Sequence, residues 1–364
     1  MLQTPFYDPK KSYYENIDQG PFGIFADKKV FKDSGEPQYE VFGQKVYFPF
    51  GIPAGPLLNG KFIKAALDKG FDIPMQKTVR TRKKKCHPWP NVLSVKVDGD
   101  LTPEKVKKKL IADEEYTEPL SITNSFGNPS FDPDIWQPDI ANTVKHAKKG
   151  QFVAASYEGT NWENGGTQDY INDWILGARL LKETGVGFIE MNFSCPNEGT
   201  TNLLCFDVKK SQRISEAVKN EIGNTPLVIK MAYFEEKTLV DFIQTLGNIV
   251  DGFAAINTIA AEIIDKDGKQ ALPGEGRARS GVCGSTIKWA GIDMVKRIKK
   301  LRDESGMDFA IIGVGGVTVA KDYFDYISAG ADVVMSATGA MWNPSIAIEI
   351  KKMRWEMRSF VREA

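Results

Sequence analysis

The sequence predicts an α/β protein whose strands close into a (β/α)8 TIM barrel, and three observations carry this prediction. From about residue 45 onward, short and nearly continuous apolar runs alternate with longer amphipathic stretches. Such runs are typical of parallel strands that are buried on both faces. Eight runs occur, and a helical pattern follows nearly every one, which favours a closed barrel over an open doubly wound sheet.

The predicted strands are seven to nine residues long and are bounded by turn-forming residues. They span residues 47–55, 72–79, 152–159, 187–194, 226–232, 252–259, 309–317 and 332–338. The amphipathic segments predict helices at 166–184, 207–222, 236–250, 286–304 and 343–360. In the first of these helices, Ile171, Trp174, Ile175 and Ala178 recur at the spacing of one helix face.

Two segments lie outside a minimal barrel. We expect residues 1–44 to form an N-terminal extension packed on the barrel, and residues 45–364 to form one barrel domain. A long loop insertion, 80–150, follows the second strand, where barrel loops normally cover the active-site mouth. It begins with the basic run 80–85, which we interpret as a solvated loop rather than a phosphate patch.

Composition narrows the class of function. The 47 Lys and Arg residues balance 47 Asp and Glu residues, which argues against a nucleic-acid partner because such a partner needs a strong basic field. Two histidines, and four cysteines without C-x-x-C spacing, argue against a metal site or an iron–sulfur cluster. The sequence contains no run of 18 apolar residues and begins with no signal-peptide core. We therefore expect a cytoplasmic protein without membrane insertion.

Polar or small residues end six of the predicted strands, on the side where barrel enzymes hold their active sites. A local ion pair or a turn cap could explain each one alone. Together they predict a pocket for a small, planar, anionic ligand. These residues are Lys77, Asn192 with Cys195, Lys230, Asn257 with Thr258, Gly315 with Gly316, and Ala337 with Thr338.

The last two strand ends predict a phosphate site. The glycines of IIGVGGV (311–317) let backbone N–H groups approach an anion, and phosphate-binding barrels use the loops after these two strands. A dinucleotide fingerprint is not completed, because the third glycine of G-x-G-x-x-G is missing.

The sharpest motif is Asn192-Phe193-Ser194-Cys195-Pro196-Asn197. A cysteine within a buried strand is usually a small inert hydrophobe. Cys195 instead follows the strand, between asparagines and before a proline, where a loop would expose it. Here the chain resembles the dihydroorotate dehydrogenase family, specifically its soluble branch, which uses a cysteine base in N-x-S-C-P-N. The resemblance extends from roughly Phe42 to Ser345.

The resemblance implies FMN-dependent oxidation of dihydroorotate to orotate in pyrimidine biosynthesis. Cys195 would remove the C5 proton and FMN would accept the C6 hydride. Substrate binding is implied for Lys77, Asn124, Asn192, Asn197, Asn257 and Thr258. Cofactor binding is implied for Ala54, Gly55, Lys77, Thr78, Asn192, Lys230, Thr258, Ser280, Gly281, Gly315, Gly316, Ala337 and Thr338. A homodimer and an electron-transfer partner subunit are implied as well.

Some positions depart from the family pattern. The loop after the sixth strand reads Ser280-Gly281-Val282-Cys283-Gly284 where Gly-Gly-x-x-Gly is usual, and Ala337-Thr338 replaces Gly-Thr. Residues 80–123 have no counterpart in the compact soluble enzymes.

Three alternatives remain open. A dihydropyrimidine dehydrogenase-like enzyme acting on uracil or thymine tends to have histidine after Cys-Pro, where this chain has Asn197. A tRNA dihydrouridine synthase has the motif N-x-G-C-P and needs a basic surface. A catalytically silent FMN-binding barrel would have no need for Cys195 beside the amides.

Overall fold

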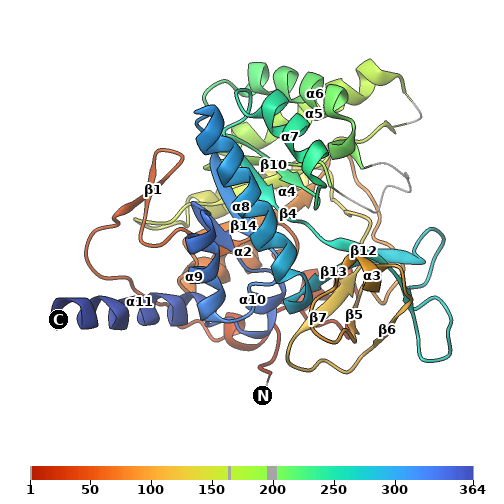
Figure 1. Ribbon diagram of the computed structural model, residues 1–364, viewed down its shortest axis with the longest axis horizontal. Helices are drawn as coiled ribbons and strands as arrows, with labels where there is room; N and C mark the ends of the chain where they lie inside the picture. The colour runs from red at the N-terminus through yellow and green to blue at the C-terminus, as the bar shows by residue number, and fades with distance from the viewer. Residues whose placement is uncertain (1, 163–164, 195–202, 364) are drawn as a thin grey trace.

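The computed structural model describes residues 2–162, 165–194 and 203–363. Eight parallel strands hydrogen-bond in chain order and close into a barrel, which confirms the predicted fold class (Figure 1). Each lies inside one of the predicted apolar runs. The strands are β3 (Phe50–Ile52), β4 (Ile73–Val79), β8 (Ala154–Tyr157), β9 (Ile189–Asn192), β10 (Leu227–Met231), β11 (Gly252–Ala255), β14 (Ala310–Val314) and β15 (Val333–Met335).

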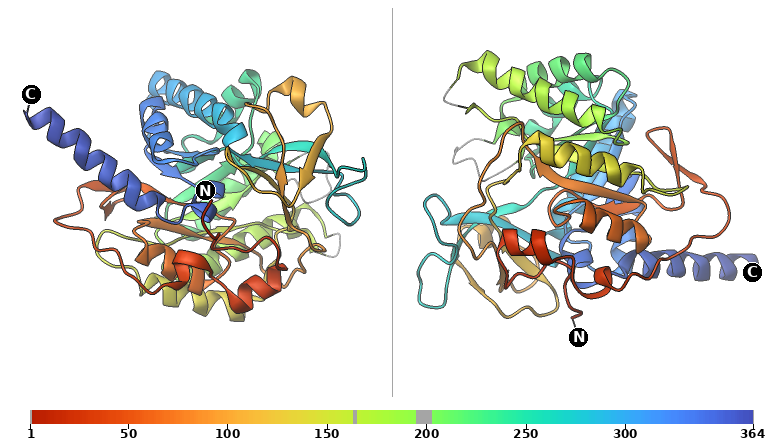
Figure 2. Two further views of the ribbon diagram at one scale, coloured as in Figure 1. Left: turned by 90° about the horizontal axis from the view of Figure 1, so that it is seen from below. Right: turned by 180° about the vertical axis from the view of Figure 1, so that it is seen from behind.

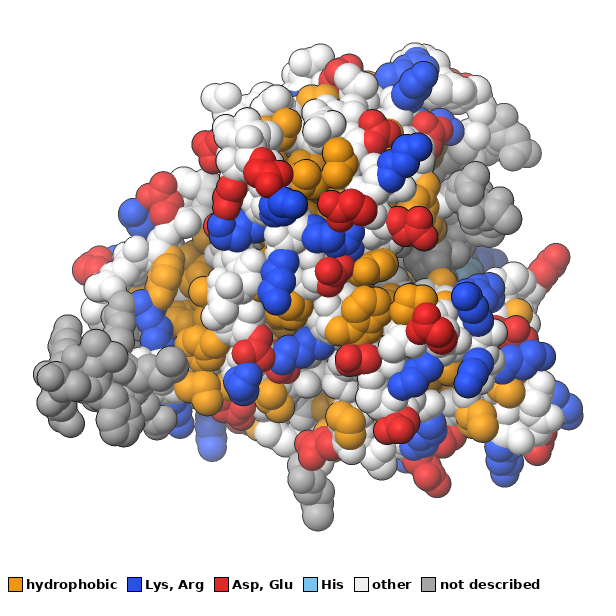
Figure 3. All heavy atoms as spheres, in the orientation of Figure 1, with side chains coloured by type: hydrophobic (Ala, Val, Ile, Leu, Met, Phe, Trp, Pro, Cys, Tyr) orange, Lys and Arg blue, Asp and Glu red, His pale blue; other side chains and the backbone are white. Residues whose placement is uncertain are grey.

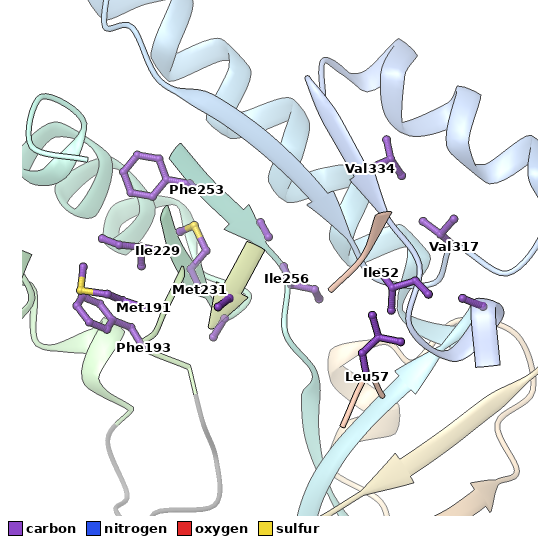
Figure 4. Close-up of a cluster of buried hydrophobic side chains, with 14 of the residues drawn as sticks. Ile52, Leu57, Met191, Phe193, Ile229, Met231, Phe253, Ile256, Val317 and Val334 are labelled. Carbon is purple, nitrogen blue, oxygen red and sulfur yellow. The ribbon is translucent and has the colours of Figure 1, made fainter. Parts of the chain in front are cut away.

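Alternate residues of each strand face opposite sides of the barrel wall. Phe188, at the start of β9, belongs to the apolar cluster inside the barrel, so Glu190 and Asn192 face inward as well. Met191 and Phe193 belong to the second, larger cluster. Figure 4 shows these two side chains in one apolar group with Ile229, Met231 and Phe253 of the next two strands.

A helix follows every barrel strand on the outside, as the right-handed crossover between parallel strands requires. In α5, the predicted Trp174 and Ala178 are fully buried, and the Trp174 ring lies 5.1 Å from that of Tyr157 on β8. The helices are α2 (Gly60–Asp68), α4 (Pro133–Val144), α5 (Thr167–Glu183), α6 (Val208–Ile222), α7 (Glu236–Leu246), α8 (Lys288–Ser305), α9 (Ala320–Ala329) and α11 (Ile346–Glu363).

A small hairpin closes the floor of the barrel, at the amino-terminal ends of its strands. It consists of β1 (Tyr39–Val41) and β2 (Gln44–Val46), and Val41 and Val46 are buried among the apolar residues of the barrel interior. Figure 1 shows the hairpin at the side of the barrel opposite to the second sheet. The interior is therefore apolar at this end.

The second sheet lies over the carboxyl end and is built from two loops distant in sequence. Its strands are β5 (Val92–Val95), β6 (Leu110–Asp113), β7 (Ser121–Asn124), β12 (Ile259–Ile264) and β13 (Arg279–Gly284), which also close on themselves. The segment 80–150 thus contains strands, the short helix α3 (Pro103–Val106) and the barrel helix α4. None of these elements was predicted. Strands β5, β6 and β7 have four residues each and are too short to show an alternating pattern.

The first 30 residues pack along the barrel through aromatic side chains. They include α1 (Tyr13–Gln19) and the 3-10 helix η1 (Gly23–Ala26). Phe6 stacks on Phe25 with ring centroids 4.3 Å apart, and its backbone N–H donates to the carbonyl oxygen of Met341 in α10 (Thr338–Trp342). Figure 2 shows this segment against the barrel and α11 projecting beyond it.

Acidic and basic side chains alternate over the face shown in Figure 3, in keeping with the balanced charge. Within the described ranges, none of the helices combines the length and apolar character needed to cross a lipid bilayer.

A buried ion pair fixes α11 to the barrel. The Lys351 ammonium lies 2.8 Å from a carboxylate oxygen of Asp72, which is fully buried beside β4, and 2.8 Å from one of Asp33. Burial raises the pKa of Asp72 to about 7, although Lys351 opposes the shift.

We predict that Lys351→Met lowers the free energy of unfolding by about 3–5 kcal/mol at alkaline pH, because the Asp72 carboxylate stays buried without its cation. A folded-state pKa above the unfolded value means that the protonated acid favours folding, so stability is lost as the pH rises toward 7. The deficit of the variant should therefore shrink in mild acid. Denaturant titrations on both sides of pH 7 measure it. The exposed Lys352→Met is the control, and an equal deficit at both pH values would contradict the prediction.

Candidate active site

Inside the barrel, buried polar side chains lie next to the apolar residues of the floor, on one half of the strands. Four consecutive strands carry these side chains, and in each a buried apolar residue precedes the polar one on the same face. The polar residues are Lys77 on β4, Ser156 on β8, Glu190 and Asn192 on β9, and Lys230 on β10. The other four strands stay apolar, with Ala254, Val314 and Met335 inside. The carboxyl end of the barrel interior is therefore polar on one side and apolar on the other.

Glu190 and Lys230 form a buried charged pair on neighbouring strands. Their side chains are 1 % and 5 % exposed, and Lys230 Nζ lies 3.8 Å from Glu190 Oε2. Burial raises the pKa of Glu190, whereas the Lys230 charge and a hydrogen bond from Ser156 act to lower it. The Ser156 hydroxyl in turn lies 3.2 Å from that of Thr78. A polar chain thus crosses four adjacent strands.

Lys77 lies at the end of β4 and is almost fully buried. Its ammonium is 4.8 Å from the centroid of the Phe126 ring, which attracts a cation through its electron-rich face. Phe126 follows β7 by two residues, and its ring meets that of Tyr7 from the N-terminal extension. The second sheet and the extension together therefore hold this lysine at the rim.

Asn192 and Asn257 meet across the end of β10. The Asn257 amide donates to the side-chain oxygen of Asn192 at 3.4 Å, and to the carbonyl and hydroxyl oxygens of Ser194 at 3.1 and 3.2 Å. Two predicted substrate amides are thereby brought together. Cys195 and Asn197 lie outside the described residues.

Asn124 and Thr338 converge on Cys283. The Asn124 amide lies 3.5 Å and the Thr338 hydroxyl 3.4 Å from the sulfur, and both donate to it. This contact joins the predicted substrate side of the site to the predicted phosphate side. The register of the second sheet makes it possible, because β13 runs antiparallel to β7 and pairs Gly281 with Asn124.

The predicted cofactor residues of β13 face two directions. A side chain at Gly281 would collide with Thr258, so glycine allows the two loops to approach closely. The Ser280 hydroxyl lies 2.6 Å from that of Thr123 and is therefore used within the second sheet.

The loops after β14 and β15 form a turn rich in backbone amides. Gly315 and Gly316 have φ angles of +120° and +70°, which glycine adopts without strain. The Tyr326 hydroxyl donates to the Gly315 carbonyl at 2.5 Å, and the Ser336 hydroxyl donates to Val317 at 2.6 Å. Ala337 and Thr338 begin α10 beside them. Such a nest of N–H groups is suited to an anion.

Ala54 and Gly55 follow β3 and are half-buried. An added Cβ at Gly55 would have no atom within 4 Å, so this turn borders open space.

A buried ion pair holds the loops that surround the site. Arg80 pairs with Glu158 at 3.1 Å and donates from Nε to the Asn128 carbonyl at 2.9 Å. The expectation that the whole basic run 80–85 is solvated is therefore wrong for Arg80, because it neutralises a buried carboxylate. Lys83 and Lys85 are exposed, as expected.

The sequence analysis missed Ser156, Glu190, Phe126 and Cys283. Glu190 carried a readable signal, since it is a charge in an apolar strand and shares a face with Asn192 two residues later. Phe126 and Cys283 gave none, because their partners come from distant segments.

The remaining described thiols do not suit nucleophilic chemistry. Burial raises the pKa of Cys86 to about 11 and that of Cys205 to about 12, so both stay protonated. Among the described residues, no group of three or more His, Cys, Asp or Glu side chains could hold a metal ion.

Fold and site together define a barrel whose carboxyl end gathers buried lysines, paired amides and a glycine turn, as in barrel enzymes. The family model for dihydroorotate dehydrogenase matches residues 115–356. The chain belongs to the dihydroorotate dehydrogenase family, as the sequence motifs predicted. A dihydroorotate dehydrogenase of Dictyostelium discoideum is 33 % identical over 96 % of this chain and 97 % of its own length.

Two further relatives extend the comparison. The catalytic subunit of dihydroorotate dehydrogenase B (NAD(+)) from Thermoplasma volcanium is 26 % identical over 88 % of this chain and 92 % of its own. The crystal structure of the Eimeria tenella DHODH in complex with ferulenol shares the fold, with a TM-score of 0.68 and 17 % identity over 90 % of this chain and 88 % of its own.

We predict that Gly316→Ala destabilises the protein by more than Gly268→Ala. Both glycines have positive φ angles, of +70° and +79°, so each substitution costs about 1–2 kcal/mol of backbone strain. A Cβ at position 316 would also lie 2.6 Å from the Lys288 backbone nitrogen, whereas position 268 is open. Denaturant unfolding measures the difference. Equal losses would show that the turn can relax away from α8.

Proposed function

We propose that this chain oxidises dihydroorotate to orotate, with FMN as the hydride acceptor and Cys195 as the base. Family membership supports the reaction, and one structural observation supports its location. Two buried lysines, Lys77 on β4 and Lys230 on β10, and the paired amides of Asn192 and Asn257 lie toward the carboxyl end of the barrel, above an apolar floor. This arrangement suits a planar anionic ring that is bound without access to water.

The residues present fit FMN. Its phosphate would lie on the amide turn of Gly315 and Gly316, beside Thr338. Gly55, where an added Cβ would meet no atom within 4 Å, and Lys230 would help to hold its ring. When bound, FMN supplies the hydride-accepting centre that no amino-acid side chain offers. The thirteen cofactor-binding residues predicted from the sequence are retained in this proposal.

The pocket would select the substrate by charge and by hydrogen-bond pattern. Lys77 provides the cation for the carboxylate of dihydroorotate. Asn124, Asn192 and Asn257 provide donors and acceptors for the ring edges, as would Asn197 and Thr258. A ring with a different edge pattern would leave buried amides unpaired, and it would therefore bind more weakly.

The proposed reaction forms one carbon–carbon double bond. The Cys195 thiolate takes the C5 proton, and the electron pair of that C–H bond becomes the second C5–C6 bond. The hydrogen at C6 leaves with its electron pair as a hydride. Lys230 would stabilise the negative charge that the hydride acceptor gains.

Some features stay predictions from the resemblance. These are the homodimer, the electron-transfer partner subunit and the cytoplasmic location. The dihydropyrimidine dehydrogenase-like and FMN-binding alternatives predict different outcomes in the experiment that follows.

Anaerobic addition of dihydroorotate to the purified, FMN-loaded protein should bleach the visible flavin absorbance. Cys195→Ala should retain FMN and orotate but slow the bleaching about 10²–10⁴-fold, the usual contribution of a general base. Cys205→Ala, which removes a buried protonated thiol, is the control and should react at the wild-type rate. Bleaching of the wild type by dihydrouracil alone would favour the uracil and thymine alternative, and no bleaching by either compound would favour a silent barrel.

We further predict that Lys77→Ala weakens orotate binding about 10- to 100-fold, because a charge-assisted hydrogen bond contributes about 1.5–3 kcal/mol. Binding is followed as a perturbation of the flavin spectrum. Uracil lacks the carboxylate, so its affinity should change much less. The exposed Lys85→Ala is the matched control. Equal losses for orotate and uracil would contradict the carboxylate role.

A further inference from the structure

Glu190 is a buried carboxylate whose partners do not satisfy it. It lies inside the barrel, two residues before Asn192 and on the same face. Ser156 hydrogen-bonds to the carboxylate, but within the described part of the chain Oε2 accepts no hydrogen bond. Lys230 Nζ is 3.8 Å from this oxygen, which is within Coulombic range but beyond hydrogen-bond distance.

A second buried lysine–carboxylate pair in the same barrel is in hydrogen-bond contact and has both carboxylate oxygens satisfied. Lys351 Nζ lies 2.8 Å from Asp72, whose other oxygen accepts a backbone N–H from Phe48 at 2.6 Å. That pair joins α11 to the floor of the barrel. The Glu190–Lys230 pair is longer and leaves an oxygen unsatisfied, although its side chains are about as buried as those of Lys351 and Asp72. The attraction between Glu190 and Lys230 is therefore weaker than it would be at the 2.8 Å separation of Lys351 and Asp72.

We propose that Glu190 is a positioning residue that holds Lys230 in the pocket and partly offsets its charge, and that it thereby lowers the midpoint potential of the bound flavin. This inference rests on the proposed function, because it requires FMN beside Lys230. The inference extends that function by assigning a role to Glu190, which lies closer to the barrel floor than the predicted substrate and cofactor residue Asn192.

The direction of the effect follows from the charges. Two-electron reduction adds negative charge to the flavin ring, and Lys230 favours that charge. An ionised Glu190 beside Lys230 opposes it, because interactions between charges are weakly screened in a buried site. Burial raises the pKa of Glu190, and the Lys230 charge and the Ser156 hydroxyl oppose that rise, so the effect belongs to the pH range in which the carboxylate is ionised. Glu190 therefore makes the reduced cofactor a better electron donor to the next acceptor.

The test is a dye-coupled anaerobic titration of the FMN-loaded wild type and of Glu190→Gln. Glutamine keeps the size of the side chain and removes its charge. At a fixed ambient potential, the ratio of reduced to oxidised flavin should rise at least tenfold in the variant, which is about 30 mV for a two-electron couple. Glu190→Asp retains the charge and should remain near the wild type. Ser156→Ala removes a donor that favours the ionised form, so it should raise the potential by less.

Asp72→Asn is the matched control, since it makes the same carboxylate-to-amide change in a buried pair at the opposite end of the barrel. Its flavin potential should equal that of the wild type. An unchanged or lowered potential in Glu190→Gln, or an equal shift in Asp72→Asn, would overturn this inference and leave the proposed function standing. A wild-type chain that retains no FMN would overturn the proposed function, and this inference with it.

Discussion

Closure of the eight-stranded ring is the constraint on which the rest of the molecule depends. Because no strand edge is open, every second residue must point into one interior that water does not reach from the floor. A charge placed there needs another charge, a dipole or a ligand. The chain meets this requirement by grouping its inward polar residues on four neighbouring strands, where Glu190 faces Lys230 and Ser156 faces Thr78.

The rim of the pocket depends on segments that are far apart in sequence. Strand β13 pairs with β7 and so carries Cys283 to Asn124, while Tyr7 of the N-terminal extension packs against Phe126 beneath Lys77. The insertion after β4 is thus part of the wall of the site. Its pairing with the loop after β11 fixes the distance between the predicted substrate and phosphate contacts.

The sequence was sufficient for the barrel because its strands are buried on both faces, and so each appears as an unbroken apolar run such as 226–232. It was insufficient for the second sheet, whose strands of four to six residues pair only through tertiary contacts. The search for polar residues near strand ends found Lys77 and Lys230, whereas Glu190 escaped notice because it lies near the start of β9. Cys283 became visible only when β13 was paired with β7.

The two pocket lysines have different environments, and this difference suits different tasks. Lys77 lies against the face of Phe126, which attracts a cation without carrying a formal charge. The Phe126 ring leaves the full charge of Lys77 available, which suits the binding of a carboxylate whose charge does not change. Lys230 lies opposite Glu190, so its field is partly balanced before any ligand binds. A lysine whose charge is partly offset suits a cofactor that becomes negative on reduction. Such a lysine stabilises the reduced cofactor, but not so strongly that reoxidation becomes unfavourable.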